Sequence, residues 1–223
     1  MSAGAGAVLL LATLVLACST LPDHARPQAG IMDPADYRAT DVIRYRRISR
    51  ADFRAGAPPP AVSAHATAFG AFTCANVVPD GPTRVRFDPG AQPNTWIARL
   101  EDTTFHAEMD RGCSWWNPAG IPVPSEYVLE HEQIHFALTE IQSRRLSAAL
   151  REIRLPTDSQ PAAAAQLQRR YDAMLRATME ELVRESTAFD EDTSGRHEPL
   201  RQSRWLARVE SELAKTEALP GVR

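Results

Sequence analysis

The segment His131-Glu132-Gln133-Ile134-His135 has the residue types and the spacing of a catalytic metal site. On a helix, side chains four residues apart lie one above the other on the same face, so His131 and His135 can bind one metal ion. Glu132 lies beside them, where its carboxylate can take a proton from a water molecule at the metal. The segment therefore predicts a Zn²⁺-dependent hydrolase with Glu132 as general base. The alternative is two solvated histidines on an amphipathic helix.

A catalytic zinc site needs a third protein ligand, and Glu185 is one candidate. If the helix with the histidines and the next helix form an antiparallel hairpin about Thr157, Glu185 falls near the histidines and on the apolar stripe of its own helix. A carboxylate on a buried stripe needs a partner, and a metal ion would be one. An ion pair with Arg144 or Arg145 is an equal alternative.

The elements that must position these residues are long helices in the second half of the chain. We expect one helix from Ser125 to about Arg154, because the residue before Pro156 disfavours helical backbone. Further helices are expected from about 162 to 189 and from about 198 to 218.

The first half of the chain, between Arg44 and Trp116, is rich in short β-forming runs separated by turn residues. Strands are expected at 85–87, 95–100 and 103–109, and the last of these can offer an edge to an extended peptide. A β-rich half followed by a helical hairpin and a C-terminal helix predicts an α+β fold. Together with the metal motif it predicts a zincin-like domain over residues 44–219.

The first 17 residues predict an export signal, because they carry no charge and their apolar run is too short to span a bilayer. The end of this segment, Val15-Leu16-Ala17-Cys18, resembles a bacterial lipobox, which implies cleavage before Cys18 and its lipidation. A plain cleaved signal and an uncleaved anchor are the alternatives. Residues 18–43 are proline-containing and polar and are expected to form a tether. We therefore expect a membrane-anchored lipoprotein of the bacterial cell envelope.

The remaining cysteines, Cys74 and Cys113, form an even pair in a chain that has left the reducing cytosol. They are predicted to form a disulfide. The alternative is two buried free thiols.

The composition excludes one class of partner. The 223 residues have a formal net charge of -3, which provides no basic field for a phosphate backbone, so we expect no nucleic-acid binding. The length suits one domain.

The stretch from Glu130 to Phe136 resembles the HEQxHF segment of a bacterial family of exported proteins of unknown function, which is placed by motif with the gluzincin-like HExxH zinc peptidases. The resemblance covers roughly residues 45–213, and only the zinc motif is specific by itself. Its other matching pieces are Ile48–Phe53 with Pro58-Pro59, Cys113–Trp116, and Phe189–Thr193 followed by Gln202 and Trp205.

This resemblance points to Asp190 as a metal ligand or as a group that orients a metal-bound histidine. An ideal hairpin about Thr157 would put Asp190 beyond the histidines, which favours the orienting role. The chain departs from the family in having Phe189 at the position of a tyrosine, and in placing His197 later than the family's histidine.

The resemblance and the motif together imply a peptidase that acts on polypeptide or on peptidoglycan peptide. Tyr127 or His197 can donate a hydrogen bond to the developing oxyanion. The alternative function is a non-catalytic envelope lipoprotein that uses the metal only to fix its helices and serves as a binding module.

Overall fold

The computed structural model describes residues 41–194 and 196–217, so the expected export signal, Cys18 and most of the expected tether lie outside the described residues. The tether was expected to extend to residue 43. Strand β1 (Val42–Arg44) nevertheless pairs with β6 (Phe105–Asp110), so the folded unit already includes Val42.

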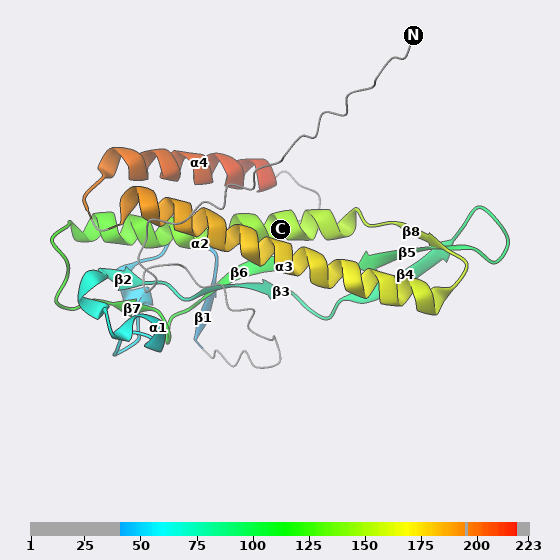
Figure 1. Ribbon diagram of the computed structural model, residues 1–223, viewed down its shortest axis with the longest axis horizontal. Coiled ribbons are helices and arrows are strands. Elements are labelled where there is room, and N and C mark those ends of the chain that lie inside the picture. The colour runs from blue at the N-terminus through cyan, green and yellow to red at the C-terminus, as the bar shows by residue number, and fades with distance from the viewer. Residues whose placement is uncertain (1–40, 195, 218–223) are drawn as a thin grey trace, which may run out of the picture.

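The first half of the described chain is built from short antiparallel strands (Figure 1). Three sheets are present, with the strand orders β1-β6-β3, β2-β7 and β4-β5-β8. The strands not yet given are β2 (Ala71–Phe72), β3 (Ala75–Pro79), β4 (Arg84–Pro89), β5 (Trp96–Glu101), β7 (Trp115–Trp116) and β8 (Leu155–Thr157). Short helical turns lie at η2 (Arg50–Asp52), α1 (Pro60–Ser63) and η3 (Ala66–Ala68). The three predicted strands correspond to β4, β5 and β6.

Three long helices follow and lie along one side of the sheets (Figure 1). They are α2 (Ser125–Arg151), α3 (Gln160–Thr193) and α4 (Pro199–Glu217). The predicted order of a β-rich half followed by helices is therefore confirmed. Helix α2 ends before Pro156, as predicted, and the chain then forms β8 before α3 begins.

The hairpin of α2 and α3 is not symmetric about Thr157. A symmetric hairpin would place Leu129 opposite Glu185, whereas the structure places Gln142 there, with 2.7 Å between the Gln142 amide nitrogen and a Glu185 oxygen. Strand β8 pairs with β5, so α3 begins beyond the end of α2, and its first turns cover the β4-β5-β8 sheet. There Ala163 and Leu167 pack in one buried cluster with residues of β5 and of the last turn of α2.

Helix α2 is held against β6 by buried polar side chains. The Glu140 carboxylate accepts hydrogen bonds from the backbone N–H of Ala107 (2.8 Å) and from Arg144 (2.7 Å). The Ser147 hydroxyl accepts one from the backbone N–H of Phe105 (2.8 Å). Strand β6 also lies between β1 and β3. The expectation that residues 103–109 offer a free edge to a peptide is therefore wrong.

Cys74 and Cys113 are at disulfide distance, with their Cα atoms 5.8 Å apart. The predicted pairing is confirmed. The link joins the residue before β3 to the turn before β7.

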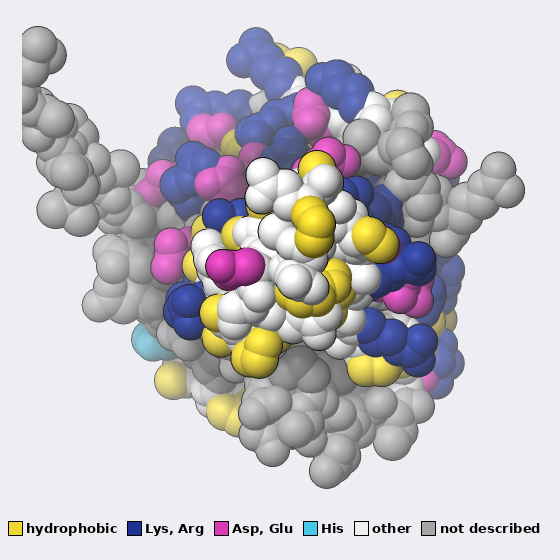
Figure 2. Space-filling view, turned by 90° about the vertical axis from the view of Figure 1, so that its right-hand side faces the viewer, with side chains coloured by type: hydrophobic (Ala, Val, Ile, Leu, Met, Phe, Trp, Pro, Cys, Tyr) yellow, Lys and Arg dark blue, Asp and Glu magenta, His cyan; other side chains and the backbone are white. Residues whose placement is uncertain are grey.

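The end of the molecule with the β4–β5 hairpin shows Lys and Arg side chains around a tip of hydrophobic and other, mostly uncharged, groups (Figure 2). It lies toward the C-terminal end of α2 (Figure 1), whereas His131 lies near the N-terminal end of this helix. Within the described residues, no helix combines the length and the apolar character needed to cross a bilayer.

Replacing Glu140 by glutamine is predicted to lower the free energy of unfolding by about 3 kcal/mol, because Arg144 then loses its partner in a buried position. Urea unfolding measures this change. The matched control is Glu181→Gln, which breaks the more exposed Glu181–Arg184 pair and should cost less than about 1 kcal/mol. Equal losses in the two variants would contradict the role given to Glu140.

Candidate metal centre

Three potential metal ligands converge between α2 and the last turn of α3. The Asp190 Oδ1 atom lies 3.0 Å from His131 Nε2 and 3.0 Å from His135 Nε2, and the two Nε2 atoms are 3.2 Å apart. Within the part of the chain that the structure describes, these residues form the one group of three or more His, Cys, Asp or Glu side chains that can hold a metal ion. Helix α2 thus presents the two histidines on one face, as their spacing predicted.

The separations fit a tetrahedral ion. Ligand atoms about 2.0 to 2.1 Å from a tetrahedral Zn²⁺ lie about 3.3 Å from one another. The three observed separations, 3.0, 3.0 and 3.2 Å, are close to this value. The donor set of two imidazole nitrogens and one carboxylate oxygen also suits zinc better than calcium or magnesium, which prefer oxygen ligands.

The electrostatics of the group favour a bound cation. Burial opposes ionisation of Asp190, yet the two histidines lower its pKa far below the usual range, so the carboxylate is charged. Burial also opposes protonation of His135, but the charges of Asp190 and Glu132 raise its pKa. The negative charges of Asp190 and Glu132 therefore both favour a cation beside the imidazoles.

Glu132 is buried, with 5% of its surface exposed, and takes part in no hydrogen bond or ion pair with any described residue. Its charge nevertheless acts on His135. A buried carboxylate without a polar partner is costly. A water molecule beside a metal ion at His135 would supply such a partner, which is the position required of a general base.

Thr193 fixes the tautomer of His131. Its hydroxyl is buried, donates its single proton to the Phe189 carbonyl at 2.7 Å, and lies 3.3 Å from His131 Nδ1. Because the hydroxyl proton is already used, Nδ1 of a neutral His131 must be the donor in this contact. The Nε2 atom is then unprotonated and directs its lone pair toward Asp190 and His135.

The aromatic ring of Phe189 packs against both imidazoles. It stacks on His131 with 4.4 Å between ring centroids and meets His135 edge-on at 5.0 Å. Trp205 of α4 also packs against Phe189, with 5.4 Å between the ring centroids. Phe189 is completely buried and is an apolar support for the two histidines.

The Tyr127 hydroxyl links two segments of the chain and is not available to donate a hydrogen bond to an oxyanion. Its hydroxyl donates to the Thr193 carbonyl at 2.9 Å and accepts from the Glu198 N–H at 3.3 Å, which ties the start of α2 to the connection between α3 and α4. His197 is exposed and packs edge-on against the Tyr127 ring at 4.9 Å. Among the described residues His197 has no hydrogen-bond partner, so of the two expected oxyanion donors it is the one whose polar atoms are not used by such a link.

Glu185 lies away from the histidines. It is buried and accepts a hydrogen bond from Gln142 at 2.7 Å, and it pairs with Arg208 of α4 and with Arg145 at 3.8 Å. Of the two candidates for the third ligand, Asp190 lies with the histidines and Glu185 does not, because the pairing of β8 with β5 shifts the register of α3. Asp190 Oδ1 lies 3.0 Å from the Nε2 atom of each histidine, a position from which it can serve as a ligand.

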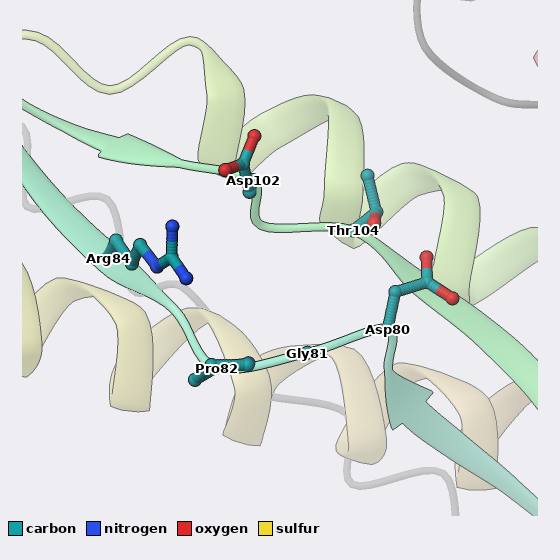
Figure 3. Close-up of a pocket in the computed structure, with 6 residues that line it drawn as sticks. All are labelled: Asp80, Gly81, Pro82, Arg84, Asp102 and Thr104. Atoms are coloured by element: carbon teal, nitrogen blue, oxygen red, sulfur yellow. The ribbon is translucent and has the colours of Figure 1, made fainter.

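The larger of two described hollows, about 310 Å³, lies elsewhere in the fold. Figure 3 shows the Arg84 side chain reaching into it between Asp102 and Pro82. Its other carboxylate, on Asp80, pairs with Arg44 at 2.9 Å. No residue of the metal group lines this hollow.

No protein-family model, curated protein or solved structure matches this chain. The resemblance to the HEQxHF family therefore stays a prediction, and the functional interpretation rests on the geometry of the site.

The purified protein is predicted to bind about one zinc ion per chain. Asp190→Ala should abolish this binding, because it removes the oxygen that faces both histidines. Glu185→Gln is the control and should keep full zinc content. Elemental analysis after dialysis measures the metal, and zinc loss in Glu185→Gln alone would contradict the ligand assignment.

Thr193→Val should weaken zinc affinity by about 10- to 100-fold, because valine has the same shape but cannot accept the His131 Nδ1 proton. Thr193→Ser restores the hydroxyl and should bind zinc nearly as the parent does. Competition with a chelating dye measures both constants. Equal affinities of the valine and serine variants would show that the hydroxyl does not orient His131.

Proposed function

We propose that the protein is a zinc-dependent peptidase of the bacterial cell envelope, with a zincin-like arrangement of its site. The observation that carries the proposal is the convergence of His131, His135 and Asp190 beside the unpaired carboxylate of Glu132. The predicted export signal and the disulfide at Cys74 and Cys113 support a compartment outside the cytosol.

In this proposal His131, His135 and Asp190 hold the metal. When bound, zinc supplies a Lewis acid and lowers the pKa of a coordinated water to about 7. Glu132 takes the proton of the attacking water and then passes it to the nitrogen of the leaving amine. Thr193 keeps His131 in the tautomer that binds metal, and Phe189 excludes water from one side of the imidazoles.

A peptide substrate is supported by the edge of β3. This strand pairs with β6 on one side and is the outer strand of its sheet in the described part of the chain. Ala75 packs against the buried cluster that includes Phe136, the residue after His135, and the strand therefore runs beside the metal-binding helix. An extended peptide that pairs with β3 would therefore bind close to the helix that carries the histidines. Polypeptide and peptidoglycan peptide both present such a backbone.

The alternative is a binding module in which the metal only fixes the helices. One observation favours it: the ligands come from both α2 and α3, so a bound ion would join the two helices whether or not it performs chemistry. The role of Glu132 separates the two functions, because a structural ion does not require it.

Glu132→Gln is predicted to keep the zinc and to lower the rate of peptide cleavage by about 10²- to 10⁴-fold, because the amide cannot accept a proton. Cleavage of a general peptide library, followed by mass spectrometry, measures the loss. Glu126→Gln, on the exposed first turn of the same helix, is the matched control and should cleave at the parent rate.

Two outcomes would count against the proposal. A zinc-containing parent without Glu132-dependent cleavage would favour the binding module. If the parent protein binds no zinc, both the peptidase function and the binding-module function are contradicted.

A further inference from the structure

The second hollow of the structure lies at the start of α2 and has a volume of about 180 Å³. Its apolar walls include Trp116, Ile121 and Val128. Small residues, among them Ala119 and Gly120, form another part of the lining. Because the lining comes from β7, the following loop and α2, the hollow depends on the tertiary fold.

The walls of the hollow are fixed without a ligand. A Cβ atom at Gly70 would lie 2.8 Å from the Val128 side chain and 3.0 Å from that of Ile121, so this wall can carry no side chain. The Asn117 amide is buried and holds the facing loop, since it donates to the Phe69 carbonyl at 2.8 Å and accepts from the Ala119 N–H at 3.0 Å. Binding there needs little rearrangement.

The hollow is one helical turn from the general base of the proposed peptidase. Val128 and Glu132 are four residues apart on α2, so they lie on one face about 6 Å apart along the axis. An extended peptide advances about 3.3 Å per residue. A side chain that enters the hollow therefore belongs to a residue within about two positions of the bond beside Glu132.

The chemistry of the lining selects the side chain. The polar atoms of Asn117 are used by their own loop. The Arg50 guanidinium lies 5.3 Å from the centroid of the Trp116 ring and forms no ion pair with any described residue. Apolar walls favour an apolar group, and the free positive charge of Arg50 repels lysine and arginine.

We propose that this hollow is the specificity pocket of the enzyme and receives an uncharged apolar side chain of the peptide substrate. The inference rests on the proposed peptidase function. The pocket adds a substrate class to that function. We expect peptides that carry an apolar residue such as leucine or phenylalanine, and not a basic residue, close to the cleaved bond.

The test uses binding, so that it does not depend on turnover. Zinc-loaded full-length Glu132→Gln protein is titrated with fluorescein-labelled alanine-based hexapeptides that carry Leu, Phe or Lys at each position in turn. Fluorescence polarisation should show that Leu or Phe at one position binds at least about 10-fold more tightly than Lys there. Cleavage of the same peptides by the parent should show the same preference.

Ala119→Trp, added to Glu132→Gln, fills the hollow from its exposed rim and should remove the preference. Ala91→Trp is the matched control, since Ala91 is also exposed but lies in the β4–β5 hairpin at the other end of the molecule. Both variants must keep the zinc content of the parent.

The outcomes separate the two proposals. Equal binding of the Leu, Phe and Lys peptides, or the same preference in the Ala119→Trp and Ala91→Trp variants, would overturn the pocket and leave the peptidase untouched. A preference that Ala119→Trp removes, in a parent that cleaves nothing, would support the pocket as a binding site and overturn the peptidase.

Discussion

Helix α2 is buried on most of its faces, and this burial makes it costly to leave a polar side chain on those faces without a partner. Glu140 meets the requirement fully, because the Ala107 N–H and Arg144 both donate to it. Glu132, about two turns earlier, is equally buried and has no such partner among the described residues. The two carboxylates therefore differ: Glu140 fastens the helix to the sheet, whereas Glu132 is the one that the proposed function uses as a proton acceptor.

The sequence was sufficient for the features that depend on local spacing. The position of the histidines on one helical face, the three strands and the pairing of Cys74 with Cys113 all follow from neighbouring residues and cysteine count. The third ligand depends instead on the register between two helices. That register is set by three residues, Leu155–Thr157, which pair with β5 and carry the start of α3 past the end of α2. A helical pattern cannot reveal this pairing, and a hairpin centred on Thr157 brings Glu185 too near the histidines and Asp190 too far past them.

Several residues that resemble the HEQxHF family have structural roles around the site. Gln133 accepts from the Ile48 N–H at 2.7 Å and so holds the segment before η2 against α2. The Gln202 amide donates to the Tyr127 carbonyl at 3.0 Å and to Glu130 at 2.9 Å, and Trp205 donates to Asp192 at 2.9 Å. These contacts fasten α4 to the other two long helices. The geometry of the ligands is thereby stabilised by groups that do not touch a metal, which is why a motif alone could not distinguish their role.

The number of ligands bears on whether a metal here is catalytic or structural. Structural zinc sites are closed by four protein ligands, whereas catalytic sites use three and leave one position for water or substrate. In the described part of the chain, the group at His131 contains three ligand atoms, all within 4.8 Å of one another, and no fourth His, Cys, Asp or Glu side chain joins them. Because Glu132 is buried beside this group, the fourth position would face a carboxylate that can accept a proton. A site that served only to join α2 and α3 would gain nothing from an unpaired buried carboxylate, whose desolvation is costly. The arrangement is therefore better suited to activating a water molecule than to fixing two helices.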